Sequence, residues 1–268
     1  MYEAFYGFRE KPFHVTADPT FLFPSRHHQE ALAHLTYGIR ERLGFLLITG
    51  EVGTGKTTLA KALVSRMGNP VKTALILNPA LSGTELLKAI LRDFGVEPGG
   101  TARGHLIQAI EQFLLQQAAL GGMGVVIIDE AQALSANALE QIRLLSNVET
   151  PKTKLLQIVL VGQPELEQWL ATKPGLRALN QRIAVRYRVM PLSSEEVAHY
   201  IEHRLKVAGR AEGPPCFTQE AVVKIAAASF GIPRRINLLC DRALLSGFVH
   251  GSTAVQEEMV EEILGENP

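Results

Sequence analysis

The stretch LLITGEVGTGKTTLAKAL, residues 46–63, decides the fold. An apolar run ends in a glycine-rich loop, and an amphipathic pattern typical of a helix follows it. The loop has the spacing G-x-x-x-x-G-K-[ST] in the required context of strand, loop and helix. The backbone N–H groups of such a loop converge on one anion, and the following helix adds its positive end. We therefore predict a phosphate-binding loop rather than an ordinary tight turn, built from Gly50, Glu51, Val52, Gly53, Thr54, Gly55, Lys56, Thr57 and Thr58.

A second motif, VVIIDEAQ at residues 125–132, places two acids after an apolar strand. Ligands of open α/β sheets bind at the carboxyl ends of the strands, which is where Asp129 and Glu130 emerge. We expect Thr57 and Asp129 to hold Mg²⁺, and Glu130 to polarise the attacking water. Lys56 brings its charge to the outer phosphates. No guanine-reading element is found, so the predicted cofactors are ATP and Mg²⁺.

The alternative interpretation of these acids is an acidic cap on the next helix, a role that Ser135 or Asn137 could equally fill. The letters DEAQ also occur in superfamily-two helicases. Those proteins need two facing α/β domains, and this chain has room for one. The pairing with the phosphate loop favours the catalytic interpretation.

Short apolar runs alternate with helical patterns between residues 44 and 189. Continuously apolar strands indicate a parallel sheet buried on both faces, and the alternation with helices indicates a doubly wound α/β core. The predicted strands are 44–49, 73–78, 124–129, 156–161 and 183–189. The predicted helices between them are 56–67, 82–94, 103–120 and 135–148. After Pro191 only helical patterns remain, at 193–208, 218–229, 234–249 and 255–264.

This order predicts three parts: an aromatic-rich segment over residues 1–40, an αβα core over 41–190 and a small all-helical domain over 191–268. Seven aromatic residues fall between residues 2 and 23. We expect this segment to pack on the core and to form one wall of an adenine pocket near FPSRHHQEALAHL, residues 23–35. A surface for a partner protein is the alternative.

The composition is that of an ordinary soluble protein. Lys and Arg number 27, as do Asp and Glu, so no global field favours nucleic acid or membrane. No apolar run approaches the ~18 residues of a membrane span. Cys216 and Cys240 are expected to be reduced core thiols in a cytoplasmic protein.

Three further side chains are candidates for the site. Gln163 ends the strand within IVLVGQPEL, residues 158–166, and could contact the terminal phosphate or the water; a turn residue before Pro164 is the alternative. Arg182 lies at the start of a strand, in a basic stretch (173–188) without an acid, where it could act in trans on a neighbouring subunit. Arg234 follows a proline at a predicted helix start, where a nearby phosphate would offset the unfavourable helix dipole.

The chain resembles the AAA+ ATPases of the general secretion pathway protein A (ExeA-type) family, which has relatives in pilus and exopolysaccharide export. The matching stretches cover nearly the whole chain: residues 1–39, GEVGTGKTT, IIDEAQ, VLVGQPEL, residues 180–205 and GIPRRINLLCDRALL. The resemblance implies that Lys56 and Thr57 are the Walker A pair and that Asp129 and Glu130 form Walker B. It also implies that Gln163 is sensor 1, Arg182 the arginine finger, Arg234 sensor 2 and residues 191–264 the AAA+ lid.

Many members of that family continue into a membrane helix and a periplasmic peptidoglycan-binding domain. The resemblance therefore predicts an ATPase portion or a stand-alone relative: a homo-oligomeric, cytoplasmic Mg²⁺-dependent ATPase, or one peripheral to the inner membrane, that remodels a protein partner in export or envelope assembly. Two alternatives stay open. One is a DNA-associated ATPase similar to transposition helper proteins, and the other is a nucleotide-gated switch that barely hydrolyses ATP.

Overall fold

The computed structural model describes residues 1–151, 153–210 and 214–265. The chain forms two compact units. One comprises His27–Val52 and Lys56–Val189, and is called the sheet unit below. The other comprises Met1–Arg26, Gly53–Gly55 and the residues from Met190 onward, and is called the helical unit. Each unit encloses a hydrophobic cluster of its own.

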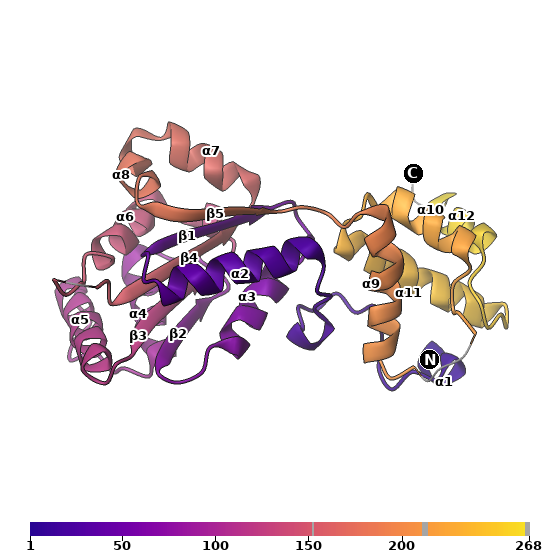
Figure 1. The fold of residues 1–268 in the computed structure, drawn as a ribbon, viewed down its shortest axis with the longest axis horizontal. Helices are drawn as coiled ribbons and strands as arrows, with labels where there is room; N and C mark the ends of the chain where they lie inside the picture. The colour runs from indigo at the N-terminus through magenta and orange to yellow at the C-terminus, as the bar shows by residue number, and fades with distance from the viewer. Residues whose placement is uncertain (152, 211–213, 266–268) are drawn as a thin grey trace. The chain divides into compact units, whose positions relative to one another are not determined.

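The sheet unit is built on five parallel strands in the order β2-β3-β4-β1-β5. Their bounds are β1 (Phe45–Gly50), β2 (Val71–Ile76), β3 (Met123–Ile128), β4 (Leu156–Gly162) and β5 (Ile183–Val189). Every residue of β1 and β4 is buried, which requires cover on both faces of the sheet. Figure 1 shows helices on both sides of these strands. The predicted five-stranded, doubly wound parallel core is confirmed.

The helices of this unit follow the strands in α/β alternation (Figure 1). They are α2 (Arg26–Arg40), α3 (Lys56–Arg66), α4 (Gly83–Phe94), α5 (Arg103–Ala119), η2 (Ala131–Ala133), α6 (Ala136–Leu145), α7 (Pro164–Thr172), η3 (Pro174–Leu176) and α8 (Arg177–Asn180). Their ends carry the expected local chemistry. At the start of α4, Ser82 and Glu85 form a reciprocal capping box.

Strand register brings three loops to one edge of the sheet. Thr49 in β1 pairs with Gly162 in β4, and Ile128 in β3 pairs with Leu160 in β4. The residues that follow these strands therefore emerge together at the carboxyl edge. They are the phosphate loop, the acids after β3 and Gln163, so the topology gathers these predicted site residues but not Arg182, which precedes β5.

The helical unit contains no strand ladder among its described residues, in agreement with the predicted all-helical domain. Its elements are α1 (Tyr2–Tyr6), η1 (Pro19–Phe21), α9 (Ser194–Val207), α10 (Gln219–Ser229), α11 (Pro233–Val249) and α12 (Glu257–Gly265). Ser193 and Glu196 form a capping box at the start of α9, and Pro233 occupies the first turn of α11.

The aromatic N-terminal segment differs from its prediction. Its buried aromatic side chains belong to the hydrophobic cluster of the helical unit, not to that of the sheet unit: Tyr2, Phe8, Phe13 and Phe21. The expectation that this segment packs on the ATPase core is therefore wrong for residues 1–26. Hydrogen bonds hold the segment to α9 of the helical unit: the guanidinium of Arg204 donates to the carbonyl oxygens of Pro12 and His14. The three-part domain division itself stays a prediction.

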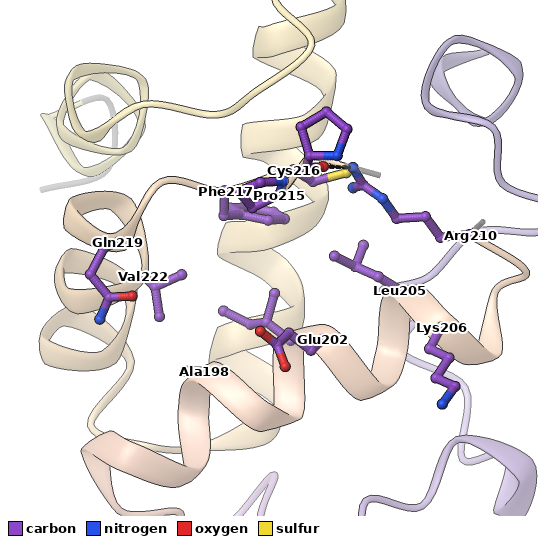
Figure 2. A pocket seen from close by; sticks show the side chains of 12 residues that line it. Ala198, Glu202, Leu205, Lys206, Arg210, Pro215, Cys216, Phe217, Gln219 and Val222 are labelled. Carbon is purple, nitrogen blue, oxygen red and sulfur yellow. Dashed lines mark hydrogen bonds between the residues drawn. The ribbon is translucent and has the colours of Figure 1, made fainter. Parts of the chain in front are cut away.

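Two further expectations concern the thiols and membrane spans, and the surface also carries a hollow that the sequence did not predict. Cys216 and Cys240 are buried and unbridged, as expected. A hollow of about 570 Å³ lies between α9 and α10. Arg210 lines it and donates to the carbonyl oxygen of Pro214, and Figure 2 shows Phe217 on the opposite side of the hollow from Lys206. No predicted site residue lines it. Across the described ranges, no helix combines the length and the apolar character that crossing a bilayer requires.

Candidate nucleotide site

The phosphate loop joins β1 to α3 in the way that its sequence predicts. Gly53 and Gly55 adopt φ values of +84° and +91°, a left-handed region that residues with a Cβ rarely enter. Helix α3 begins at Lys56, directly after the loop. The side chain of Lys56 is buried, and its Nζ donates to the carbonyl oxygens of Gly50 (2.8 Å) and Glu51 (2.9 Å). The ammonium is thus folded back along the loop and held beside it.

Thr57 and Asp129 link the two motifs. The hydroxyl of Thr57 donates to Oδ2 of Asp129 across 2.5 Å, and the backbone N–H of Glu130 donates to Oδ1 across 3.0 Å. Asp129 is 2% exposed, and its own N–H donates to the carbonyl oxygen of Ile76 on β2. Both carboxylate oxygens and the hydroxyl therefore occupy a fixed place at the N-terminus of α3.

Burial shifts the pKa values of two charged groups of the site, Lys56 and Asp129. Desolvation lowers the pKa of Lys56, although the carboxylates of Glu130 and Asp129 oppose the shift. Desolvation also raises the pKa of Asp129, against the effect of its hydrogen bonds from Thr57 and Glu130. Both charges are thus held at a cost to the fold, which is typical of a site that a charged ligand completes.

Glu130 lies directly after Asp129, between β3 and η2. Its backbone is left-handed (φ 50°, ψ 39°), a conformation that costs a residue with a Cβ on the order of 1 kcal/mol or more. Its Oε2 accepts hydrogen bonds from the amide groups of Gln132 and of Gln163, the latter across 3.2 Å. Oε1 has no hydrogen-bond partner among the described residues. Glu130 is therefore a carboxylate anchored through one oxygen.

The cap interpretation of the acids is wrong, because Ser135 occupies that role. The hydroxyl of Ser135 accepts from the N–H of Ala138 (3.1 Å) and so caps α6. Glu130 precedes η2 but makes no side-chain cap bond there. The sequence argument that Ser135 could equally supply the cap identified the residue that does so.

Gln132 is a site residue that the sequence analysis did not single out. Its Oε1 accepts from the backbone N–H of Gln163 (3.1 Å), while its Nε2 donates to Glu130. The available clue was its place two residues after Glu130, within the motif VVIIDEAQ. A tight 3-10 turn after Glu130 returns the Gln132 side chain to the sheet edge.

The basic stretch between residues 173 and 188 is less available than its sequence predicts. Arg182 donates from Nη1 to Asn147 Oδ1 (2.6 Å) and to Ser146 Oγ (3.1 Å), at the C-terminal end of α6. Arg186 donates to Asn180, and Arg188 pairs with Glu51. Three arginines of the stretch are thus engaged by partners in the sheet unit, of which only Asn180 belongs to the stretch itself. The trans role of Arg182 stays a prediction.

Arg234 lies in the first turn of α11 in the helical unit, and its side chain is exposed. No acid stands in that first turn, so the dipole argument keeps its premise. Its sensor role stays a prediction, as does that of Gln163 toward a phosphate.

The residues present fit a magnesium–nucleoside triphosphate complex. Two left-handed glycines shape a backbone nest suited to phosphate, and Lys56 supplies the cation. The hydroxyl of Thr57 and the carboxylate of Asp129 are hard oxygen donors of the kind that Mg²⁺ prefers, alongside phosphate oxygens and water. A separate protein-only metal cluster of three or more His, Cys, Asp or Glu residues is absent from the described part of the chain.

Comparison with known proteins agrees with this geometry. The family profile described as "AAA domain" matches residues 39–170. General secretion pathway protein A from Aeromonas hydrophila is 47% identical over 253 residues, which cover 94% of this chain and 46% of that protein. Residues 39–170 therefore belong to the AAA domain family, and the chain is related to general secretion pathway protein A over 94% of its length. It spans less than half the length of that relative.

Other similar proteins belong to different cellular systems by name. The ATP-dependent target DNA activator B of Escherichia phage D108 is 34% identical over 116 residues, 43% of this chain and 34% of that protein. The Aeropyrum pernix ORC2 protein, solved in ADPNP–ADP complexes, has a TM-score of 0.72 at 20% identity and covers 96% of this chain and 71% of its own. The Thermotoga maritima RuvB Holliday junction branch migration motor has a TM-score of 0.59 at 20% identity. The match covers 88% of this chain and 66% of the RuvB chain. At such identities the two solved structures establish the AAA+ fold and nothing further.

Proposed function

We propose that this AAA+ protein is a Mg²⁺-dependent ATPase whose turnover remodels or assembles a partner protein in bacterial secretion, pilus or exopolysaccharide export. The observation that carries the proposal is the 2.5 Å bond between Thr57 and Asp129, which joins the phosphate loop to the end of β3. The proposed role in export is based on the relation to general secretion pathway protein A. No residue of the chain identifies the partner protein.

Each side chain of the site has a distinct part in this proposal. The nest and Lys56 bind the phosphates, and Thr57 with Asp129 orients the metal–phosphate complex. Mg²⁺, when bound, screens the phosphate charge and polarises the phosphoryl group. The carboxylate of Glu130 takes the proton of the attacking water, because its Oε1 is open while Oε2 is anchored. Arg182 from a neighbouring copy is proposed to complete the site, which makes the working form a homo-oligomer.

The test separates binding from chemistry with two variants and one control. Lys56→Ala should lose nucleotide binding, whereas Glu130→Gln should bind ATP–Mg²⁺ as the wild type does and lose on the order of 10²–10⁴ in hydrolysis rate. Lys88→Ala removes an exposed lysine of α4 and should change neither. Titration with a fluorescent ATP analogue measures binding, phosphate release measures turnover, and circular dichroism confirms folding. Turnover of a folded Lys56→Ala at the wild-type rate would remove the phosphate-loop assignment.

A DNA-associated ATPase is the second candidate, favoured by the match to ATP-dependent target DNA activator B. Arg177 is exposed, and its guanidinium has no hydrogen-bond or ion-pair partner within the described residues, so it could contact a phosphate backbone. Duplex DNA should then stimulate hydrolysis, and the stimulation should fall steeply with salt. Capture with Glu130→Gln in the presence of ATP would show whether protein or DNA is retained. A slow nucleotide-gated switch would instead show tight binding and a single-turnover rate close to zero.

A further inference from the structure

Gln132 connects the ends of two neighbouring strands through one side chain. It lies in η2, directly after the left-handed backbone of Glu130. Its Nε2 donates to Oε2 of Glu130, and its Oε1 accepts from the backbone N–H of Gln163 across 3.1 Å. The donor end of the amide thus holds the acid after β3, while the acceptor end is fixed by the residue after β4.

The two oxygens of Glu130 are used differently. Oε2 accepts from both Gln132 and the side-chain amide of Gln163 (3.2 Å). Oε1 has no hydrogen-bond partner in the described part of the chain. An ionised carboxylate accepts only, so two amide donors on one oxygen fix its plane and leave the lone pairs of the other for a water. A general base needs this orientation within hydrogen-bond reach of its proton.

Gly162, the last residue of β4, supplies an independent observation. A Cβ at this position would lie 2.9 Å from Oε1 of Gln132 and 2.8 Å from Cδ2 of Leu166. Both distances are shorter than a Cβ tolerates. The approach of the Gln132 side chain to β4 therefore depends on a position without a side chain, directly before the N–H to which it bonds.

We propose that Gln132 is a positioning residue for hydrolysis: its amide anchors the Glu130 carboxylate to the Gln163 backbone and leaves the other carboxylate oxygen facing the attacking water. The inference rests on the proposed ATPase function. Gln132 itself exchanges no proton and touches no phosphate in this role. Its loss should therefore affect the chemical step and leave nucleotide binding intact.

The main test compares Gln132→Ala with Gln168→Ala, a matched truncation of an exposed glutamine on α7. A misplaced catalytic group can cost on the order of 10²-fold in rate, so kcat of Gln132→Ala should fall by about 10–100-fold. KM and ATP affinity should stay within about twofold of the wild type. Gln168→Ala should match the wild type in both. A folded Gln132→Ala with wild-type kcat, or one whose loss lies in KM alone, would overturn the proposal.

A double variant separates positioning from support of the fold. Adding Gln132→Ala to Glu130→Gln should lower the residual rate no further, because the group to be positioned is already gone. A further tenfold loss in that background would contradict the proposal, since Gln132 would then act on something other than Glu130. Failure of the proposed function is distinguishable, because it would appear as absent hydrolysis in the wild type itself.

Two other changes keep the inference testable if Gln132→Ala does not fold. Gln132→Glu retains an acceptor for the Gln163 N–H but places a like charge against Glu130, so kcat should fall at least as far as in Gln132→Ala. Gly162→Ala changes no site residue, and its Cβ crowds the Gln132 amide together with Leu166. Gly162→Ala should lower kcat severalfold with unchanged ATP affinity. Full activity of both Gln132→Glu and Gly162→Ala would overturn the proposed role of Gln132.

Discussion

Lys56 in the sheet unit and Arg204 in the helical unit are both buried cations held by backbone carbonyls. Each is 5% exposed. Lys56 donates to Gly50 and Glu51, and Arg204 donates to Pro12 and His14. Burial lowers the pKa of both side chains. By burial, pKa and hydrogen bonding alone, the two residues are alike.

Their surroundings separate them. Lys56 faces the carboxylates of Asp129 and Glu130, which come from another strand and leave a carboxylate oxygen open. The guanidinium of Arg204 instead lies over the ring of Phe21, at 4.4 Å from its centroid, and close to Tyr200. A buried cation therefore indicates a ligand site only where groups of opposite charge converge with acceptors to spare. Otherwise it fastens one segment to another.

The largest expected effect concerns a third cation, Arg182, which is neither fully buried nor paired with an acid. If it acts in trans, Arg182→Ala should bind ATP normally and lose roughly 10³–10⁵ in rate. Mixing it with Lys56→Ala should restore some turnover, because a Lys56→Ala subunit presents an intact arginine to a neighbour that holds ATP. Phosphate release from the mixture measures this recovery.

Co-assembly of the two variants has to be shown by light scattering. A mixture that co-assembles and stays inactive would contradict the trans role and leave Arg182 as a residue that only secures the end of α6. Arg186 and Arg177 would then be the next candidates, with the bond from Arg186 to Asn180 making Arg177 the more accessible of the two.

A change of intermediate size should follow from Arg204→Ala. Two carbonyl oxygens would lose their donor and Phe21 its packing partner, so we expect a loss of about 2–5 kcal/mol in the free energy of unfolding. Thermal denaturation measures the loss, and trypsin should cleave sooner after Arg9. The exposed Arg242→Ala is the control and should stay within about 0.5 kcal/mol of the wild type. Weakened ATP binding at unchanged stability would instead make Arg204 a functional cation and erase the contrast with Lys56.

The smallest expected effect is on the free energy of unfolding of Asp129→Asn, which should be higher than that of the wild type. Burial raises the pKa of Asp129, so the folded state favours the protonated acid. Its contribution is therefore favourable at low pH and is lost as pH rises through the raised value. The amide keeps an acceptor for the Glu130 N–H, and the Thr57 hydroxyl can reverse its role.

Without nucleotide, the free energy of unfolding of Asp129→Asn should thus exceed that of the wild type by about 0.5–2 kcal/mol at pH 7. Single stabilising substitutions commonly give gains of this size. The difference should shrink toward pH 4, close to the ordinary pKa of an aspartate. Denaturation between pH 4 and 7 tests this while hydrolysis is lost. A destabilised variant at pH 7 would show that the carboxylate is a net structural asset.

Much of the fold was predictable because its core strands are apolar throughout. The predicted strand 156–161 agrees with β4 to within one residue, and the predicted helix 56–67 with α3 likewise. The edge strand β2 was placed two residues late, since only two of its six residues are buried and the apolar run TALILN extends beyond it. Helix α7 was missed although Pro164 at its first position and Glu165 in its first turn are start features.

The site was predictable where residue type and chemistry coincide, as in the phosphate loop and the two acids after β3. Gln132 was not, because a glutamine after an acid has many uses, and its role depends on which backbone lies opposite. The packing of the aromatic segment was equally inaccessible. Its partner, Arg204, lies about 190 residues away in the chain and reads in the sequence as an ordinary helical arginine.

The anchoring of Arg182 has a consequence for coupling between neighbouring subunits. Its guanidinium is fixed at the end of α6, and the same helix begins at Ala136, just beyond the turn that carries Glu130 and Gln132. The ten residues of α6, a helix of about 15 Å, therefore separate Glu130, the proposed general base, from Arg182, the arginine proposed to act on a neighbouring subunit. If Arg182 acts in trans as proposed, a shift of the turn after β3 would be transmitted through α6 to the arginine that reaches the neighbouring site.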